Sequence, residues 1–366
     1  NGGSTGHELW AHDTSNHSTW RVADISSSGD GNPGRYMQQL VGDTIYFSAT
    51  DGTGDELWAY STSNHTIWQV ANINTFESNP GLYLSILVGD TIYFDAAGNL
   101  GRELWAHDTS NHSTWMVVDI TTGDSNPGYY SDILVGDTLY FTAKHGASND
   151  MELWAHDTSN HSTWQVADIN PGSQSSNPGF SGMTILVGDT IYFSANGGSS
   201  GGTSYGNELW AHDTSNGSTW RVTDVWNGSG NSNPGVYMST LVGDTIYFSA
   251  NNATFGTEMW AHDTSNHSTW LVDDLGTGNN GNGAGGSNPG IWLDILVGDT
   301  LYFSANGGST GHELWAHDTS NQSSWRVADI SSSGDGNPGR YMQHLVGDTI
   351  YFSATDGTTG DELWAH

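Results

Sequence analysis

The sequence contains no cysteine and almost no basic residue. Its 366 residues include one lysine, Lys144, and six arginines against 40 acidic residues, so the formal net charge is −33. The lack of cysteine excludes disulfides, thiolate metal sites and cysteine nucleophiles. The lack of a basic patch excludes a nucleic-acid partner, because nothing could release counterions from phosphates. No apolar run approaches the roughly 18 residues of a membrane span, so we expect no membrane insertion.

A repeat of about 50 residues organises the whole sequence. The string Leu-Val-Gly-Asp-Thr recurs seven times at spacings of 47 to 55 residues, and Glu-(Leu/Met)-Trp recurs eight times. The acid of the first string stands at Asp43, Asp90, Asp137, Asp189, Asp244, Asp299 and Asp348. We therefore interpret residues 1–366 as a single repeat domain of seven units.

Each unit has the pattern of four short strands. In the repeat unit that begins near residue 36, we predict strands at 36–41, 44–49, 56–60 and 66–73. We find no helical period of useful length in the chain. The Gly-Asp pair between the first two strands predicts a two-residue hairpin, so we assign the seven repeated aspartates as structural turn residues. The chain is expected to be all-β.

Four antiparallel strands per unit, apolar on both faces, are typical of a β-propeller blade. We predict a β-propeller of four-stranded antiparallel blades, with seven blades as the first choice. Two alternatives stay open: an open superhelical array of the same blades, and a window on a longer array.

The two ends of the sequence are near-duplicates. Residues 1–53 match residues 306–358 at 50 of 53 positions, so the array has a superperiod of six units. We hypothesise that the chain is a window on a longer repetitive protein, or that the duplicate ends exchange between chains. The expected partners are therefore copies of itself, in a head-to-tail or strand-exchanging assembly.

The repeat unit resembles a known family. Residues 40–58 read LVGDTIYFSATDGTGDELW, which is similar to the ELWxxDGT-type repeat family of large secreted and surface proteins of microbes. The resemblance implies a β-propeller-like scaffold at an extracellular or cell-surface location, with no settled activity. The sequence departs from the family after the tryptophan, where Asp13-Thr14-Ser15-Asn16 stands in place of Asp-Gly-Thr.

Asn-x-Ser/Thr sequons mark one turn of every unit. In exposed turns of a secreted chain they accept N-glycans, although the same residues are also good turn formers. The candidate glycosylation sites are Asn16, Asn64, Asn111, Asn160, Asn216, Asn266 and Asn321, with Asn227 and Asn252 in other loops.

Metal and catalytic motifs are weak. Loop carboxylates could hold Ca²⁺, but no EF-hand spacing occurs, so we assign no metal-binding residue and expect no required cofactor. The segment from His7 to His12 nearly reads as a zinc-protease motif, but its histidines are five residues apart on a strand and point to opposite faces. No catalytic residue is assigned.

Paired tryptophans recur on neighbouring strands. We expect them to fill the core between blades, and the alternative is that they are exposed and stack on sugars. The residues assigned to this inter-blade core are Trp10, Trp20, Trp58, Trp68, Trp105, Trp115, Trp154 and Trp164.

Nearly every notable polar side chain recurs in equivalent copies, whereas catalysis needs an asymmetric constellation. We therefore predict a non-enzymatic extracellular scaffold, a surface coat, filament or adhesion module. The first alternative is a multivalent carbohydrate-binding propeller that could contact surface glycans. The second is an enzyme, for which only one-off residues such as Lys144, His145 and Arg102 give a hint.

Overall fold

In the computed structural model the chain forms two compact units. The first comprises Asn1–Asp168 and Gly172–Ser175, and the second comprises Ile169–Pro171 and Ser176–His366. The residues that the structure describes are 6–27, 29–146, 150–172, 174–200, 203–276, 285–309, 311–332, 334–358 and 360–366.

The first unit contains a two-stranded sheet followed by three four-stranded sheets. The two-stranded sheet consists of β1 (Leu9–Asp13) and β2 (Ser18–Ala23). The next sheet consists of β3 (Gln38–Val41), β4 (Thr44–Thr50), β5 (Asp55–Ser61) and β6 (Ile67–Ala71). The third consists of β7 (Ser85–Val88), β8 (Thr91–Gly98), β9 (Gly101–Asp108) and β10 (Ser113–Val118). The fourth consists of β11 (Asp132–Val135), β12 (Thr138–His145), β13 (Asp150–Asp157) and β14 (Ser162–Ala167).

The second unit contains three four-stranded sheets and one of three strands. The first consists of β15 (Thr184–Val187), β16 (Thr190–Ser200), β17 (Thr203–Asp213) and β18 (Ser218–Arg221). The second consists of β19 (Ser239–Val242), β20 (Thr245–Asn252), β21 (Gly256–Asp263) and β22 (Ser268–Asp273). The third consists of β23 (Asp294–Val297), β24 (Thr300–Asn306), β25 (His312–Asp318) and β26 (Ser323–Ala328). The last consists of β27 (Gln343–Val346), β28 (Thr349–Thr355) and β29 (Asp361–Ala365).

Every sheet pairs its strands antiparallel and in chain order, and the described residues contain no helix. The prediction of an all-β chain built of four-stranded antiparallel blades is confirmed. The closed ring of seven blades and its two alternatives remain predictions. Among the described residues there is also no long apolar helix of the kind that crosses a membrane.

The Gly-Asp turns set the register of each blade. Val41 pairs with Thr44 across the turn, and Gly42 has φ +56°. A glycine with positive φ at the first central position is what a two-residue turn needs to match the twist of its strands. The Asp43 carbonyl also accepts hydrogen bonds from the N–H and the Oγ of Thr62, at 2.8 and 2.9 Å. The turn is therefore tied to the tip of the neighbouring hairpin, β5–β6.

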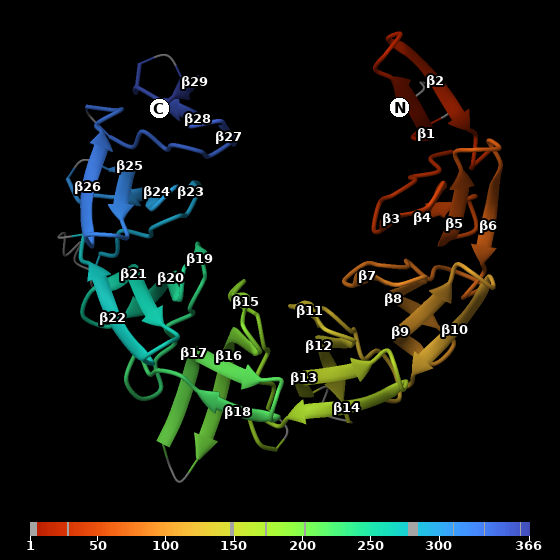
Figure 1. Cartoon of the computed structure of the whole chain (residues 1–366), viewed down its shortest axis with the longest axis horizontal. Coiled ribbons are helices and arrows are strands. Elements are labelled where there is room, and N and C mark those ends of the chain that lie inside the picture. The colour runs from red at the N-terminus through yellow and green to blue at the C-terminus, as the bar shows by residue number, and fades with distance from the viewer. Residues whose placement is uncertain are drawn as a thin grey trace. The chain divides into compact units, whose positions relative to one another are not determined.

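The cores lie between successive sheets. In the first unit, Met37 and Leu57 of one sheet pack against Ile92 and Phe94 of the next, and all four side chains are buried. Figure 1 shows that the first strands of these sheets (β3, β7, β11) follow one side of the first unit, and the last strands (β6, β10, β14) follow the other. Because a middle sheet is covered on both faces, its strands are apolar on both faces, as the sequence shows.

Candidate metal centre

Six of the eight Glu-(Leu/Met)-Trp glutamates accept a hydrogen bond from a backbone N–H of the loop after the fourth strand. In the third sheet, the Glu103 carboxylate accepts hydrogen bonds from Ser125 Oγ at 2.6 Å and from the Ile120 N–H at 3.0 Å. Glu103 is fully buried, and burial raises its pKa to about 7. The side chain thus ties the loop after the last strand of a blade to its third strand. An isolated glutamate of this kind is not evidence for a functional site.

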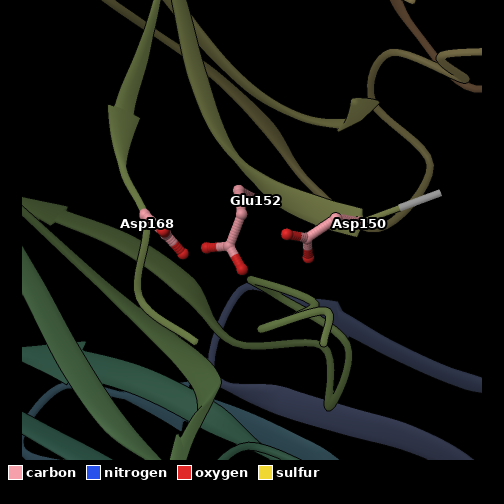
Figure 2. A group of neighbouring side chains, drawn as sticks. All are labelled: Asp150, Glu152 and Asp168. Atoms are coloured by element: carbon pink, nitrogen blue, oxygen red, sulfur yellow. The ribbon is translucent and has the colours of Figure 1, made fainter. Parts of the chain in front are cut away.

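One blade adds a third carboxylate to this arrangement. Asp150 and Glu152 lie on β13, and Asp168 follows directly after β14. One ligand atom of each residue lies within 4.8 Å of the others, and Figure 2 shows the three carboxylates converging with Glu152 in the middle. We call these three residues the carboxylate centre. It lies entirely in the first unit.

A β-bulge directs Asp168 into this centre. Leu153 pairs with Ala167, but Trp154 pairs with Gln165, so one extra residue, Val166, stands opposite no partner. A bulge of this kind bends its strand and changes the direction of the side chains that follow. The residue after Ala167 is therefore brought back toward β13, beside Glu152.

Asp150 is the one residue of the centre that the repeat does not template. The pair of Glu152 with Asp168 recurs in the neighbouring blade as Glu103 with Asp119, but the position of Asp150 is glycine in all seven other copies: Gly6, Gly54, Gly101, Gly206, Gly256, Gly311 and Gly360. A Cβ on Gly101 would lie 2.2 Å from a carbonyl oxygen of the following loop, so a side chain does not fit there.

The loop after the fourth strand has a different conformation in the blade where the Asp150 side chain replaces glycine. The Arg102 N–H donates to the Asp124 carboxylate at 2.8 Å, whereas the corresponding Met151 N–H donates to Ser175 Oγ at 2.9 Å. The replacement of a repeat glycine by Asp150 is therefore accompanied by a rearranged loop. This local change creates a three-carboxylate group that the preceding blade does not have.

The electrostatics of Asp150 are unfavourable without a cation. Asp150 is 1% exposed, and its Oδ1 atom is buried without a hydrogen-bond partner among the described residues. Burial raises the pKa of Asp150, the charge of Asp168 raises it further, and His145 opposes both. His145 is the register partner of Asp150 on β12, and its ring lies 6.0 Å from that of Trp154.

The donor set fits a hard divalent cation. Three carboxylates supply up to six oxygen atoms, and oxygen ligands in irregular geometry are what Ca²⁺ prefers. Asp150 and Glu152 are buried while Asp168 is exposed, so the centre is closed on one side and open to water on the other. The sequence alone assigned no metal-binding residue, and the signal that could have found this centre is the acid at a position that is otherwise always glycine.

The predicted sequons occupy the tips of the hairpins between the third and fourth strands. Asn16, Asn64, Asn111, Asn160, Asn216, Asn266 and Asn321 are all exposed, as is Asn227. At a typical tip, Asn111 Nδ2 donates to the Asp108 carboxylate at 2.6 Å. Asn252 differs, because it is half-buried and its Nδ2 donates to the Val225 carbonyl at 2.5 Å. Glycan occupancy stays a prediction.

The tryptophans assigned to the core divide into two groups. Trp58, Trp68, Trp105, Trp115 and Trp154 are partly buried and pack against the clusters between sheets.

Trp10, Trp20 and Trp164 are 45%, 44% and 39% exposed, so their assignment to the inter-blade core needs correction. The first two belong to the two-stranded sheet, which lacks the first and second strands of a full blade. Trp164 lies on β14, in the same place as the partly buried Trp115 on β10.

The one-off basic residues serve different purposes. Arg102 is buried and donates to the Asp95 carboxylate at 2.6 Å, so it neutralises a buried acid. His145 lies beside Asp150, as described above. Lys144, its neighbour on β12, pairs with Met151.

Comparison with known proteins gives a fold likeness only. No family model matches the sequence, and no curated protein matches it. An oligogalacturonate lyase in complex with manganese is similar in structure, with a TM-score of 0.44 and 10% identity over 88% of this chain and 85% of that one. A prolyl endopeptidase (TM-score 0.46, 11% identity, 90% of this chain and 49% of that one) and a puromycin hydrolase (0.46, 11%, 98% and 55%) are similar as well.

The prediction of a non-enzymatic scaffold, with a carbohydrate-binding propeller as its alternative, is wrong. It rested on the argument that equivalent blades offer no asymmetric constellation for catalysis. Three of the similar solved structures are enzymes, a lyase, an endopeptidase and a hydrolase, and this finding stands against the prediction. In this chain the repeat is broken at Asp150, and the break creates an asymmetric group of acids.

Proposed function

We propose that this chain is a divalent-cation-binding protein and that Ca²⁺ is held by the carboxylate centre. The observation that supports this most strongly is the buried, unpartnered Oδ1 of Asp150, which belongs to a group of three carboxylates. A buried carboxylate is costly unless it is paired or coordinates a metal. A cation would supply the missing partner and neutralise the repulsion among the three acids.

The three residues would divide the work according to their burial. Asp150 and Glu152 would bind the cation from the protein side, and Asp168 would bind it from the solvent side. When bound, the cation would supply a Lewis acid that can polarise an oxygen atom of a ligand. His145 would hold its ring beside Asp150 and limit the access of water from β12.

We also propose an extracellular or cell-surface location. Extracellular modules bind Ca²⁺ with a Kd of about 10⁻⁴–10⁻³ M. We expect a site with only three acidic ligands to bind Ca²⁺ about this weakly, so it would be occupied outside the cell. The resemblance to the ELWxxDGT-type repeat family, which we keep as a proposal, supports the same location. Self-association through the duplicate ends stays a prediction.

Calorimetric titration of chelator-treated protein tests the site. We expect Ca²⁺ to bind with one site per chain and more tightly than Mg²⁺ or Mn²⁺. Asp150→Gly, which restores the residue found in the other seven copies, and Asp150→Asn should both abolish binding. The matched control is Asp119→Asn, because Asp119 accompanies Glu103 in a blade whose corresponding position is Gly101. Ca²⁺ binding that survives both Asp150 variants contradicts the site, and tighter binding of Mn²⁺ contradicts the choice of metal.

A further inference from the structure

A cavity of about 480 Å³ lies between the third and fourth sheets of the first unit. Its lining includes Tyr93 of β8, Trp115 of β10 and Asp108 at the end of β9, together with Asp137 and His161 from turns of the next sheet. It is separate from the carboxylate centre, since none of the three acids of that centre lines it.

Two aromatic side chains form walls of this cavity. Tyr93 is buried and its ring lies 5.4 Å from that of His156. Burial lowers the pKa of His156 to about 4, so this histidine brings no positive charge to the cavity at neutral pH. Trp115 is half-buried and packs against the core between the same two sheets. The walls are therefore held in place by the packing of the blades.

Two acidic side chains make the cavity negative. Asp108 accepts hydrogen bonds from Ser110 Oγ at 2.6 Å and the Ser110 N–H at 2.8 Å, and these lower its pKa and keep it ionised. Asp137 stands in the Gly-Asp turn, and its carbonyl accepts hydrogen bonds from Thr158. The described residues that line the cavity include no lysine or arginine.

The ligand that this chemistry recognises is an organic cation. Aromatic faces attract ammonium groups through the ring quadrupole, and nearby carboxylates add a direct charge interaction. A bare metal ion is a poor fit. Among the described residues, the ligand atoms of Asp108, Asp137 and His161 do not form a group close enough to share one ion, unlike those of the carboxylate centre. A net charge of −33 also favours the approach of cations from solution.

The repeat supplies two natural variants of this cavity. In the preceding blade, Ser61 stands where Asp108 stands, so that copy lacks one acid. In the second compact unit, Gln322 stands at the position that corresponds to His161. Its Nε2 donates a hydrogen bond to Tyr247 Oη at 3.0 Å. Tyr247 corresponds to Tyr93, so in that copy the glutamine side chain contacts the tyrosine hydroxyl from the position that a histidine holds beside Tyr93. Both changes are therefore compatible with the blade fold.

We propose that the cavity lined by Tyr93, Trp115, Asp108 and Asp137 binds the alkylammonium group of a small molecule. The aromatic walls surround the alkyl or methyl groups, and the two carboxylates balance the charge. Because the cavity and the carboxylate centre share no residue, this proposal stands independently of the proposed Ca²⁺ site.

Titration of the folded chain with choline and n-butylammonium tests this proposal, with tryptophan fluorescence and calorimetry as readouts. We expect saturable binding of one or both amines, and none of 3,3-dimethyl-1-butanol, the neutral isostere of choline. Asp108→Ser should weaken binding about ten-fold, the range expected for a hydrogen bond or contact to a charged group. His161→Gln should abolish binding by placing an amide at Tyr93, as Gln322 does at Tyr247.

The matched control is Asp43→Asn, which removes the acid of the Gly-Asp turn between β3 and β4 of the preceding blade and should leave amine binding unchanged. Circular dichroism melts show whether each variant is folded. Equal binding of the neutral isostere, or unchanged affinity in both folded Asp108→Ser and His161→Gln, overturns the proposal, as does the absence of saturable binding. A lysine-containing peptide that binds while the free amines do not overturns the small-molecule ligand and assigns the cavity to a protein partner.

Discussion

Asp150→Asn should stabilise the chain in the presence of a chelator and remove the stabilisation that Ca²⁺ gives. Ligand atoms of the three carboxylates lie within 4.8 Å of one another. Two like charges at that distance repel by about 3.5 kcal/mol at an effective dielectric constant of about 20. Burial and the charge of Asp168 raise the pKa of Asp150, and this shift relieves part of the repulsion, so we expect a gain of about 1–3 kcal/mol in the variant.

Calcium should reverse the order of stability. At a free concentration of about one hundred times Kd, a bound ligand stabilises the folded state by about 2.7 kcal/mol. For a unit of this size that corresponds to a rise in Tm of roughly 5–10 °C. Differential scanning calorimetry with EDTA and with Ca²⁺ measures both effects on one sample. A variant that melts below the wild type in EDTA, or that keeps the full Ca²⁺ shift, would refute the reasoning.

Three further predictions concern the blades themselves. Arg102→Met should destabilise the chain by about 3–5 kcal/mol in denaturant titrations, because it leaves the Asp95 carboxylate buried and unpaired; adding Asp95→Ser should restore most of the loss. Gly101→Ala should cost more than about 3 kcal/mol, since φ is +116° and the Cβ meets a carbonyl oxygen at 2.2 Å, whereas Gly136→Ala, with open space, should cost about 1 kcal/mol. Glu103→Gln tests a pH effect. Burial raises the pKa of Glu103 to about 7, so its protonated form stabilises the fold fully below about pH 4.5 and this contribution is lost as pH rises through about 7. The variant should flatten the slope of stability against pH in that window, and an unchanged slope contradicts the assignment.

Much of the fold follows from short-range sequence patterns. The pairing of Val41 with Thr44 depends only on the Gly-Asp turn between them, since glycine readily adopts the φ of +56° that Gly42 has. The strands follow in the same way, because alternation and turn residues are local properties. Boundaries moved slightly: the strand expected at 66–73 runs over Ile67–Ala71.

The exposure of individual side chains did not follow from the pattern. Trp115 and Trp164 have the same place in their units, yet the first is half-buried and the second is 39% exposed. Burial depends on what covers a strand from outside its own unit. A repeat gives equivalent residues different neighbours whenever the surrounding loops and sheets differ.

The sequence by itself determined that this chain is a repeat of four-stranded antiparallel blades with few positive charges, because turns, alternation and composition are encoded within each unit. The tertiary structure alone decided that Asp150, Glu152 and Asp168 meet. Two of these acids are separated from the third by a hairpin, and the bulge at Val166 sets the direction of Asp168. A carboxylate acquires a function from the charges that surround it, and here those are set only when β13 pairs with β14 around the bulge.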